Sequence, residues 1–265
     1  MDQPTKRGKR GSEKQLDHFN YRDEEDAEAH LRRVLGSLGL DDEMLEMVRE
    51  QFHKFVEDQV MPHAHEWHLA DNLIPIEVVN QMAELGVFGL TVPEEYGGAG
   101  LNCTQYAKVV KTMAYAAPAY RSIFSINVGM FNSAIKNGGT DAQKAEWWPR
   151  IANGAIACFG LTEPGSGSDS AAMATTARPD PDGNGWILNG TKRYITNANK
   201  ADLFTVMART DPDTPGPKGV SAFIVERDTP GVTVGVPEKK MGQQGAHICD
   251  VIFEDARVPA ENMIA

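Results

Sequence analysis

The hydrophobic pattern of the chain changes once, near Gly154, and this change limits the possible folds more than any other feature. Before Gly154, apolar residues recur at steps of three and four, as on one buried face of a helix. After it, short runs rich in Val, Ile, Phe and Thr alternate with turn residues, as in antiparallel strands. We therefore predict an α+β protein, with an all-α helical domain followed by an antiparallel β-barrel or sandwich domain.

Three segments are expected along the chain. Residues 1–40 form a polar N-terminal extension because basic and acidic charges follow one another there in blocks. Residues 41–153 form the helical domain and residues 154–265 the β-barrel domain. Helices are predicted near residues 76–85, 104–114, 122–135 and 141–151, and strands near residues 156–161, 186–188, 203–208, 220–225, 232–236 and 248–253. Residues 180–185, Asp-Pro-Asp-Gly-Asn-Gly, predict a tight hairpin turn.

The composition excludes several classes of protein. With 265 residues, 41% of them apolar, the chain can bury a sizeable core and is not of the disordered class. Three scattered cysteines do not make a disulfide framework and fit a reducing compartment. A net charge of −11 argues against a nucleic-acid partner, and no apolar run approaches the roughly 18 residues of a membrane helix. We expect a cytoplasmic protein, or one of the mitochondrial matrix if it is eukaryotic.

Residues 159–169 are the strongest local candidate for a binding site. A predicted strand ends at Thr162, a proline follows, and Gly165 and Gly167 leave backbone N–H groups open. Such a loop can hold an anion or the polar edge of a ring, although similar loops between strands are common. It lacks the Gly-Lys-Ser/Thr of a phosphate loop. Glu163 and Asp169, the carboxylates in this loop, are interpreted as turn and capping residues.

Residues 189–197 are a second candidate. A turn leads into a predicted strand on which period-two alternation places Tyr194 and Thr196 on one face. An aromatic ring beside a hydroxyl suits a planar heteroaromatic ligand, and an ordinary cross-strand pair is the alternative. His63, His65 and His68 lack the spacing of a metal-binding helix, so no metal is expected.

Taken together and in this order, the two segments resemble the acyl-CoA dehydrogenase family of flavoproteins. Three further parts of the sequence are similar to that family's loop before its third helix, its approach to the barrel and its closing strands: residues 86–100, residues 138–144 with 147–149, and residues 241–245 with 251–259. The resemblance covers roughly residues 41–265. It implies FAD as the cofactor, an acyl-CoA as the substrate, and desaturation of the thioester by removal of an α proton and hydride transfer to flavin N5.

The resemblance also implies roles for individual residues. The loop would wrap the flavin, with Thr162 at the pyrimidine edge and Gly167 and Ser168 at the pyrophosphate. Thr196 would lie near N5, and Tyr194 stands where many relatives have tryptophan. The implied flavin-binding residues are Phe159, Leu161, Thr162, Gly167, Ser168, Tyr194, Ile195 and Thr196, and the implied substrate-binding residues are Ser168, Ile123, Ile126 and Lys218.

The family's catalytic glutamate and its last four-helix domain come after the barrel, and this sequence stops at Ala265 as the barrel finishes. We therefore expect a chain truncated before its base, with the base glutamate beyond Ala265, acting on short or branched acyl-CoA. An electron-transferring flavoprotein is the implied acceptor, and a homo-oligomer the implied assembly of the full-length protein. Two alternatives remain open: a non-catalytic fragment that binds flavin or acyl-CoA, and an oxygen-using relative such as an acyl-CoA oxidase or a flavin monooxygenase.

Overall fold

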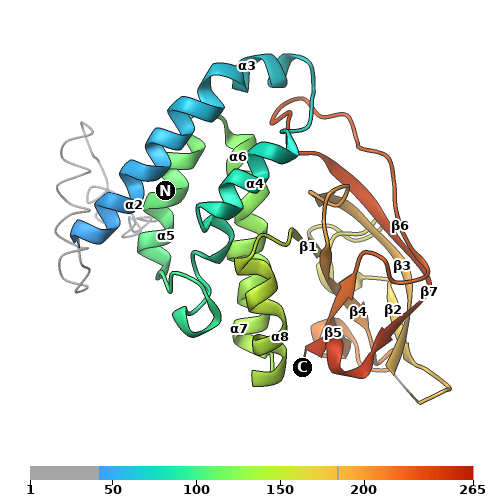
Figure 1. Ribbon diagram of the computed structural model, residues 1–265. Coiled ribbons are helices and arrows are strands. Elements are labelled where there is room, and N and C mark those ends of the chain that lie inside the picture. Colours follow the sequence, from blue (N-terminus) through green and yellow to red (C-terminus); the bar gives the residue numbers. More distant parts are fainter. Residues whose placement is uncertain (1–41, 184, 265) are drawn as a thin grey trace, which may run out of the picture. The chain divides into compact units, whose positions relative to one another are not determined.

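The computed structural model describes residues 42–183 and 185–264 (Figure 1). The chain divides into two compact units, residues 1–44 and 45–265. Apart from residues 42–44, at the start of the first helix, the described residues all belong to the second unit. Two of the predictions lie outside the described residues. They are the polar extension, residues 1–40, and the position of the catalytic base, which is expected beyond Ala265, itself not among the described residues.

Helices occupy the first part of the described chain, as predicted. Asn102 and Gln105 form a capping box at the start of α5, and Thr140 and Gln143 form another at the start of α8. The helix predicted at 122–135 is a continuous column of three parts, because a π-helical turn interrupts it. The helical elements are α2 (Asp42–Phe55), η2 (Val56–Val60), α3 (Met61–Leu69), α4 (Ile76–Glu84), η3 (Val87–Gly89), η4 (Glu94–Tyr96), α5 (Cys103–Ala114), α6 (Pro118–Ser125), η5 (Ile126–Phe131), α7 (Asn132–Gly138) and α8 (Asp141–Ala152).

Strands occupy the second part. They are β1 (Ala157–Gly160), β2 (Thr176–Pro179), β3 (Gly185–Thr196), β4 (Leu203–Arg209), β5 (Val220–Glu226), β6 (Val232–Val234), β7 (Ile248–Pro259) and β8 (Met263–Ile264), with short 3-10 turns η6 (Ser170–Ala172), η7 (Gly216–Gly219) and η8 (Ala260–Asn262). The strands form one eight-stranded sheet in the order β6-β7-β3-β2-β4-β5-β8, with β1 also paired to β4. The α+β prediction is confirmed, with one correction: the sheet is mixed, because β4 pairs in parallel with both β1 and β2.

The predicted hairpin turn joins β2 to β3. Asp180 and Gly185 close it through a backbone hydrogen bond of 2.9 Å, and Gly183 supplies a φ of +79° that the turn requires. The strand that follows is much longer than the short run predicted at 186–188, because its Gly190 and Asn189 lie at a bulge rather than at a strand end.

In the column formed by α6, η5 and α7, the central part, η5, packs against β1 (Figure 1). Asn127 of η5 is fully buried, and its side chain forms hydrogen bonds with two backbone groups of the chain that enters β1. Its Nδ2 donates to the Ala155 carbonyl at 2.7 Å, and its Oδ1 accepts the Ala157 N–H at 2.9 Å. A buried amide that satisfies two backbone groups fixes where β1 begins, and hence where the loop after β1 lies. None of the described helices is long and apolar enough to cross a bilayer.

Candidate functional site

The loop after β1 is a tight, internally bonded turn. Glu163 and Ser166 exchange two backbone hydrogen bonds of 2.9 and 3.2 Å, and the Ser166 hydroxyl donates to the Asp169 carbonyl at 2.7 Å. Ser166 is buried, while Gly167 and Ser168 are exposed at the tip. The loop's own hydrogen bonds therefore fix its shape and leave its tip available.

Several donors of this loop point to no protein acceptor. Across residues 42–183 and 185–264, the N–H groups of Thr162, Gly165, Gly167 and Ser168 donate to no backbone or side-chain oxygen. A side chain added at Gly165 or Gly167 would meet nothing within 4 Å. Free N–H groups and short hydroxyls without covering side chains can bind an anion or the acceptor edge of a ring.

The second candidate segment lies directly beside this loop. The Arg193 N–H donates to the Thr162 carbonyl at 2.7 Å, which joins β3 to the start of the loop. The register of β3 against β7 shifts between Lys192 and Ile195, and Tyr194 within the shift has a φ of +59°. The bulge therefore interrupts regular alternation between Lys192 and Ile195, and the shared face of Tyr194 and Thr196 stays a prediction.

The bulge turns the Tyr194 ring outward, where it is 54% exposed, while Ile195 is buried and Thr196 half-buried. Arg193 steadies the ring from one side. Its guanidinium lies 5.5 Å from the ring centroid and pairs with Asp250 at 3.1 and 3.2 Å. Positive φ is strained for an aromatic residue, and such strain persists only where the surroundings hold it.

Glu163 lies in the turn as predicted, but the capping role predicted for Asp169 is wrong. Asp169 precedes η6, but its side chain caps nothing. Glu163 is buried and pairs with the fully buried Lys192 at 2.6 Å. Burial raises the pKa of Glu163, but hydrogen bonds from Lys192 and the Ala174 N–H outweigh this effect and hold its pKa below the ordinary value. The pKa of Lys192 is lowered, because the effect of burial is larger than the opposing effect of the hydrogen bond and charge of Glu163.

Lys192 is the residue that sequence reasoning missed. The signal that could have found it is a lysine within an otherwise apolar strand, since a lysine is almost never fully buried unless it is paired. The bulges in β3 hide that signal, because they break the alternation that would have marked position 192 as inward-facing.

Hydrogen bonds connect two of the predicted substrate-binding residues, Lys218 and Ile123, to the surroundings of the two candidate segments. Arg209 donates to the carbonyls of Ala171, Thr214 and Gly216, and so ties the turn after Ser168 to the loop that carries the exposed Lys218. Asn197, next to Thr196, donates to the carbonyl of the buried Ile123 at 3.0 Å. Ile126 is half-buried, three residues further along the chain.

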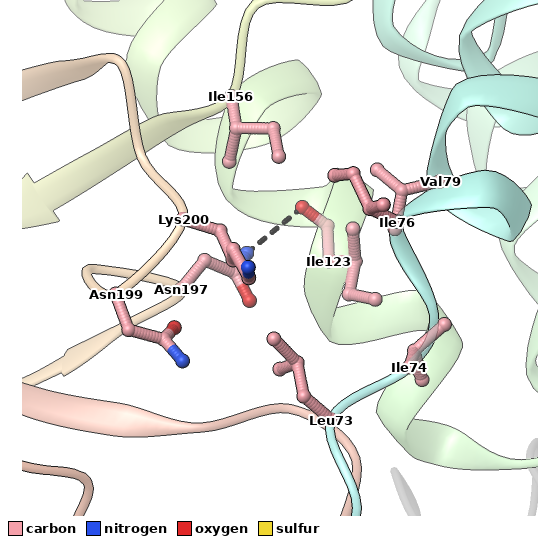
Figure 2. A pocket seen from close by; sticks show the side chains of 9 residues that line it. All are labelled: Leu73, Ile74, Ile76, Val79, Ile123, Ile156, Asn197, Asn199 and Lys200. Carbon is pink, nitrogen blue, oxygen red and sulfur yellow. Dashed lines mark hydrogen bonds between the residues drawn. The ribbon is translucent and has the colours of Figure 1, made fainter.

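A small cavity lies near Ile123 but is not the candidate site. It measures about 20 Å³, and Figure 2 shows its lining: Leu73, Ile74, Ile76, Val79, Ile123, Ile156, Asn197, Asn199 and Lys200. That volume holds one water molecule rather than a ligand. The candidate loop instead lies on open surface. Within the described residues, no group of three His, Cys, Asp or Glu side chains is arranged to bind a metal ion.

Comparison with known proteins gives the family. The family model described as acyl-CoA dehydrogenase, N-terminal domain matches residues 42–155, and the model described as acyl-CoA dehydrogenase, middle domain matches residues 158–256. Both candidate segments fall within the second match.

Relatives agree with this assignment. The chain is 41% identical over 247 residues to (2S)-methylsuccinyl-CoA dehydrogenase of Cereibacter sphaeroides, an alignment covering 89% of this chain and 44% of the relative. It is 39% identical to the mitochondrial short-chain specific acyl-CoA dehydrogenase of Mus musculus, over 83% of this chain and 52% of the relative. A glutaryl-CoA dehydrogenase structure from Mycobacterium smegmatis, in complex with FADH2, superposes with a TM-score of 0.75 at 36% identity, over 84% of this chain and 55% of that one.

The chain thus spans about half the length of the curated relatives it matches. The two family matches together include most of the described helices and strands, in the order helices then sheet. This chain belongs to the acyl-CoA dehydrogenase family and carries that family's N-terminal and middle domains.

Proposed function

We propose that this chain supplies the flavin-binding face of an FAD-dependent enzyme that desaturates an acyl-CoA thioester of short or branched chain. The observation that carries the proposal is the set of free N–H donors at Thr162, Gly167 and Ser168, placed beside the bulged strand that carries Thr196. The proposal extends to an electron-transferring flavoprotein as acceptor, to a homo-oligomer as the working form, and to a cytoplasmic location.

The chemistry of the donor set fits FAD. The pyrimidine edge of flavin and its pyrophosphate are rich in hydrogen-bond acceptors, and the free groups of the loop are donors. In this proposal Thr162 holds the ring edge, Gly167 and Ser168 approach the pyrophosphate, and Phe159 and Leu161 pack beside the ring. On the β3 side, Tyr194, Ile195 and Thr196 border the ring, with the Thr196 hydroxyl nearest the position that accepts hydride.

The substrate side of the proposal uses residues flanking the same loop. Ser168 and Lys218 lie on segments that Arg209 ties together, which suits contacts with the phosphates of a CoA nucleotide. Ile123 and Ile126 provide an apolar border for a short acyl tail. When bound, the flavin supplies the hydride acceptor.

Glu163 is not suited to removing the α proton. Its carboxylate is buried, ion-paired with Lys192 and occupied by two backbone N–H groups, from Ala174 and Thr175. A base must reach its proton within hydrogen-bonding distance, and a fully engaged buried carboxylate does not do so. The proposal therefore assigns no base among the residues of this loop, and the expectation of a base glutamate beyond Ala265 stays a prediction.

An anaerobic titration of the purified chain with FAD, followed by a short acyl-CoA such as butyryl-CoA, tests the proposal. Bound flavin that bleaches on adding acyl-CoA supports desaturation by this chain. Bound flavin that stays oxidised supports the flavin-binding role but makes this chain alone a binding module. Flavin that is rapidly reoxidised by air with oxygen consumption favours an oxidase, and no flavin binding contradicts the proposal for this chain.

Replacing Gly167 by alanine should weaken FAD binding at least about tenfold, or about 1.4 kcal/mol, because the added methyl group blocks the close approach of the pyrophosphate to the backbone. The free protein has room for this methyl group, so the fold should not change. Fluorescence titration with FAD measures the effect. Gly165→Ala is the matched control, since Gly165 is equally open and two residues away. Equal affinity of the two variants would contradict the assigned role of Gly167.

A further inference from the structure

The buried ion pair between Lys192 and Glu163 joins the two segments of the candidate site. Lys192 comes from β3 and Glu163 from the loop after β1, yet their charged atoms are 2.6 Å apart, with side chains 0% and 4% exposed. The pair is thus a direct link, shielded from solvent, between the loop with the free donors and the strand that carries Tyr194 and Thr196.

Both partners use their remaining hydrogen-bonding capacity on the same loop and its continuation. Lys192 also donates to the Leu161 carbonyl at 3.3 Å. Glu163 accepts the N–H groups of Ala174 at 2.5 Å and Thr175 at 3.0 Å, where the chain leaves the loop for β2. The pair therefore fixes the loop at its entry and at its exit.

The end of β1 is shaped to admit the lysine. A Cβ added at Gly160 would lie 3.2 Å from Lys192 Cγ and 3.4 Å from the Thr205 carbonyl. The first of these distances is shorter than ordinary van der Waals contact. Glycine at position 160 therefore leaves room for the aliphatic part of the Lys192 side chain to pass the end of β1 and reach Glu163. The packing is thus built around the pair.

Stability alone does not account for such a pair. Two charges removed from water cost about as much as their attraction returns, and apolar replacements of similar volume are often equally stable. The pair carries no net charge, so its field at the neighbouring site is weak. What it supplies is geometry, since Lys192 is the last residue in register before the bulge that turns Tyr194 outward.

From these contacts we infer that Lys192 and Glu163 are positioning residues, which hold the loop of residues 161–168 against the strand of residues 190–196 and so set the distance between the two sides of the flavin site. The link itself is a property of the folded chain. Its consequence for flavin rests on the proposed function.

The test compares three variants. Glu163→Gln combined with Lys192→Met removes the pair without leaving a lone buried charge, so the chain should still fold. Glu163→Asp keeps the charge but is one methylene too short to reach Lys192 and both N–H groups. Arg178→Met is the control, because it removes an ion pair between two strands, β2 and β7, whose partners, Arg178 and Asp255, are 53% and 76% exposed.

Two readouts separate the inference from the proposed function. Amide hydrogen exchange of peptides 161–169 and 190–197 should be at least tenfold faster in the double variant and in Glu163→Asp, with peptides 203–209 and 220–226 unchanged. FAD should bind at least tenfold more weakly to the double variant and to Glu163→Asp. Arg178→Met should match the wild type in both readouts. Unchanged exchange and affinity would overturn the inference, as would FAD affinities that change in opposite directions. If the wild type binds no FAD, the proposed function fails, and exchange alone decides whether the pair is the link.

Discussion

Replacing Lys192 alone by methionine should lower the free energy of unfolding by about 3–5 kcal/mol at pH 7, the range found when one partner of a buried ion pair is removed. Methionine fills most of the space of the lysine stem, so the loss comes mainly from the Glu163 carboxylate, which stays buried without its cation. Urea unfolding followed by circular dichroism measures the change, and the slope of the transition shows whether the unfolding remains cooperative.

The pH dependence of this loss identifies its cause. In the wild type the pKa of Glu163 lies below its ordinary value of 4.5, so between the two values the unfolded chain binds more protons than the folded one. The stability contributed by this carboxylate is therefore complete above about pH 5 and is lost as the pH falls through the folded pKa.

In Lys192→Met the sign reverses. The carboxylate keeps its burial and loses its cation, so its folded pKa rises and the folded variant takes up a proton more readily than the unfolded chain. The difference in stability between wild type and variant should therefore narrow as the pH is lowered from 7 to 4. Arg178→Met, an exposed pair, should cost no more than about 1 kcal/mol at either pH. A loss of stability in Lys192→Met that is small at pH 7, or that becomes larger as the pH is lowered, would contradict this explanation of the pair.

Sequence patterns predict the local elements of this fold well, because each depends on neighbouring residues. Helical periodicity located α4, α5 and α8, and the Asp-Pro-Asp-Gly motif located the turn between β2 and β3. Membership of the acyl-CoA dehydrogenase family was predicted mainly from two short segments, residues 159–169 and 189–197. The structure places these segments side by side through the Arg193–Thr162 hydrogen bond.

What the sequence did not predict depends on contacts between distant residues. The parallel pairing of β1 with β4 joins strands separated by more than 40 residues, and periodicity carries no information about partners. The positive φ of Tyr194 results from a bulge against β7, and tyrosine has no local preference for that conformation. Glu163 looks like a turn residue because it is next to a proline, and only the strand 29 positions later reveals its burial.

Asn127 is the second residue whose loss should have a large effect, because it fixes the chain where the helices give way to the sheet. Asn127→Leu should lower the free energy of unfolding by about 2–6 kcal/mol, since leucine leaves the Ala157 N–H and the Ala155 carbonyl unpaired, each at roughly 1–3 kcal/mol. The bond to the Ala157 N–H, at 2.9 Å, is buried, and the bond to the Ala155 carbonyl, at 2.7 Å, is partly buried, so water does not readily replace the first of them.

The comparison with Asn153 isolates this effect from the general cost of losing an asparagine. Asn153 follows α8 close to the same junction, is exposed, and should tolerate Asn153→Ala within about 0.5 kcal/mol. Chemical unfolding of both variants under the same conditions gives the two numbers. Because β1 leads directly into the candidate loop, Asn127→Leu should also speed amide exchange in residues 157–168 more than in residues 248–259. Asp202 also holds the start of β1, because its carboxylate accepts the Ile156 N–H at 2.8 Å. If Asn127→Leu lowers the free energy of unfolding by less than about 1 kcal/mol, or if exchange rises equally in both segments, Asp202 suffices to hold the start of β1 without Asn127.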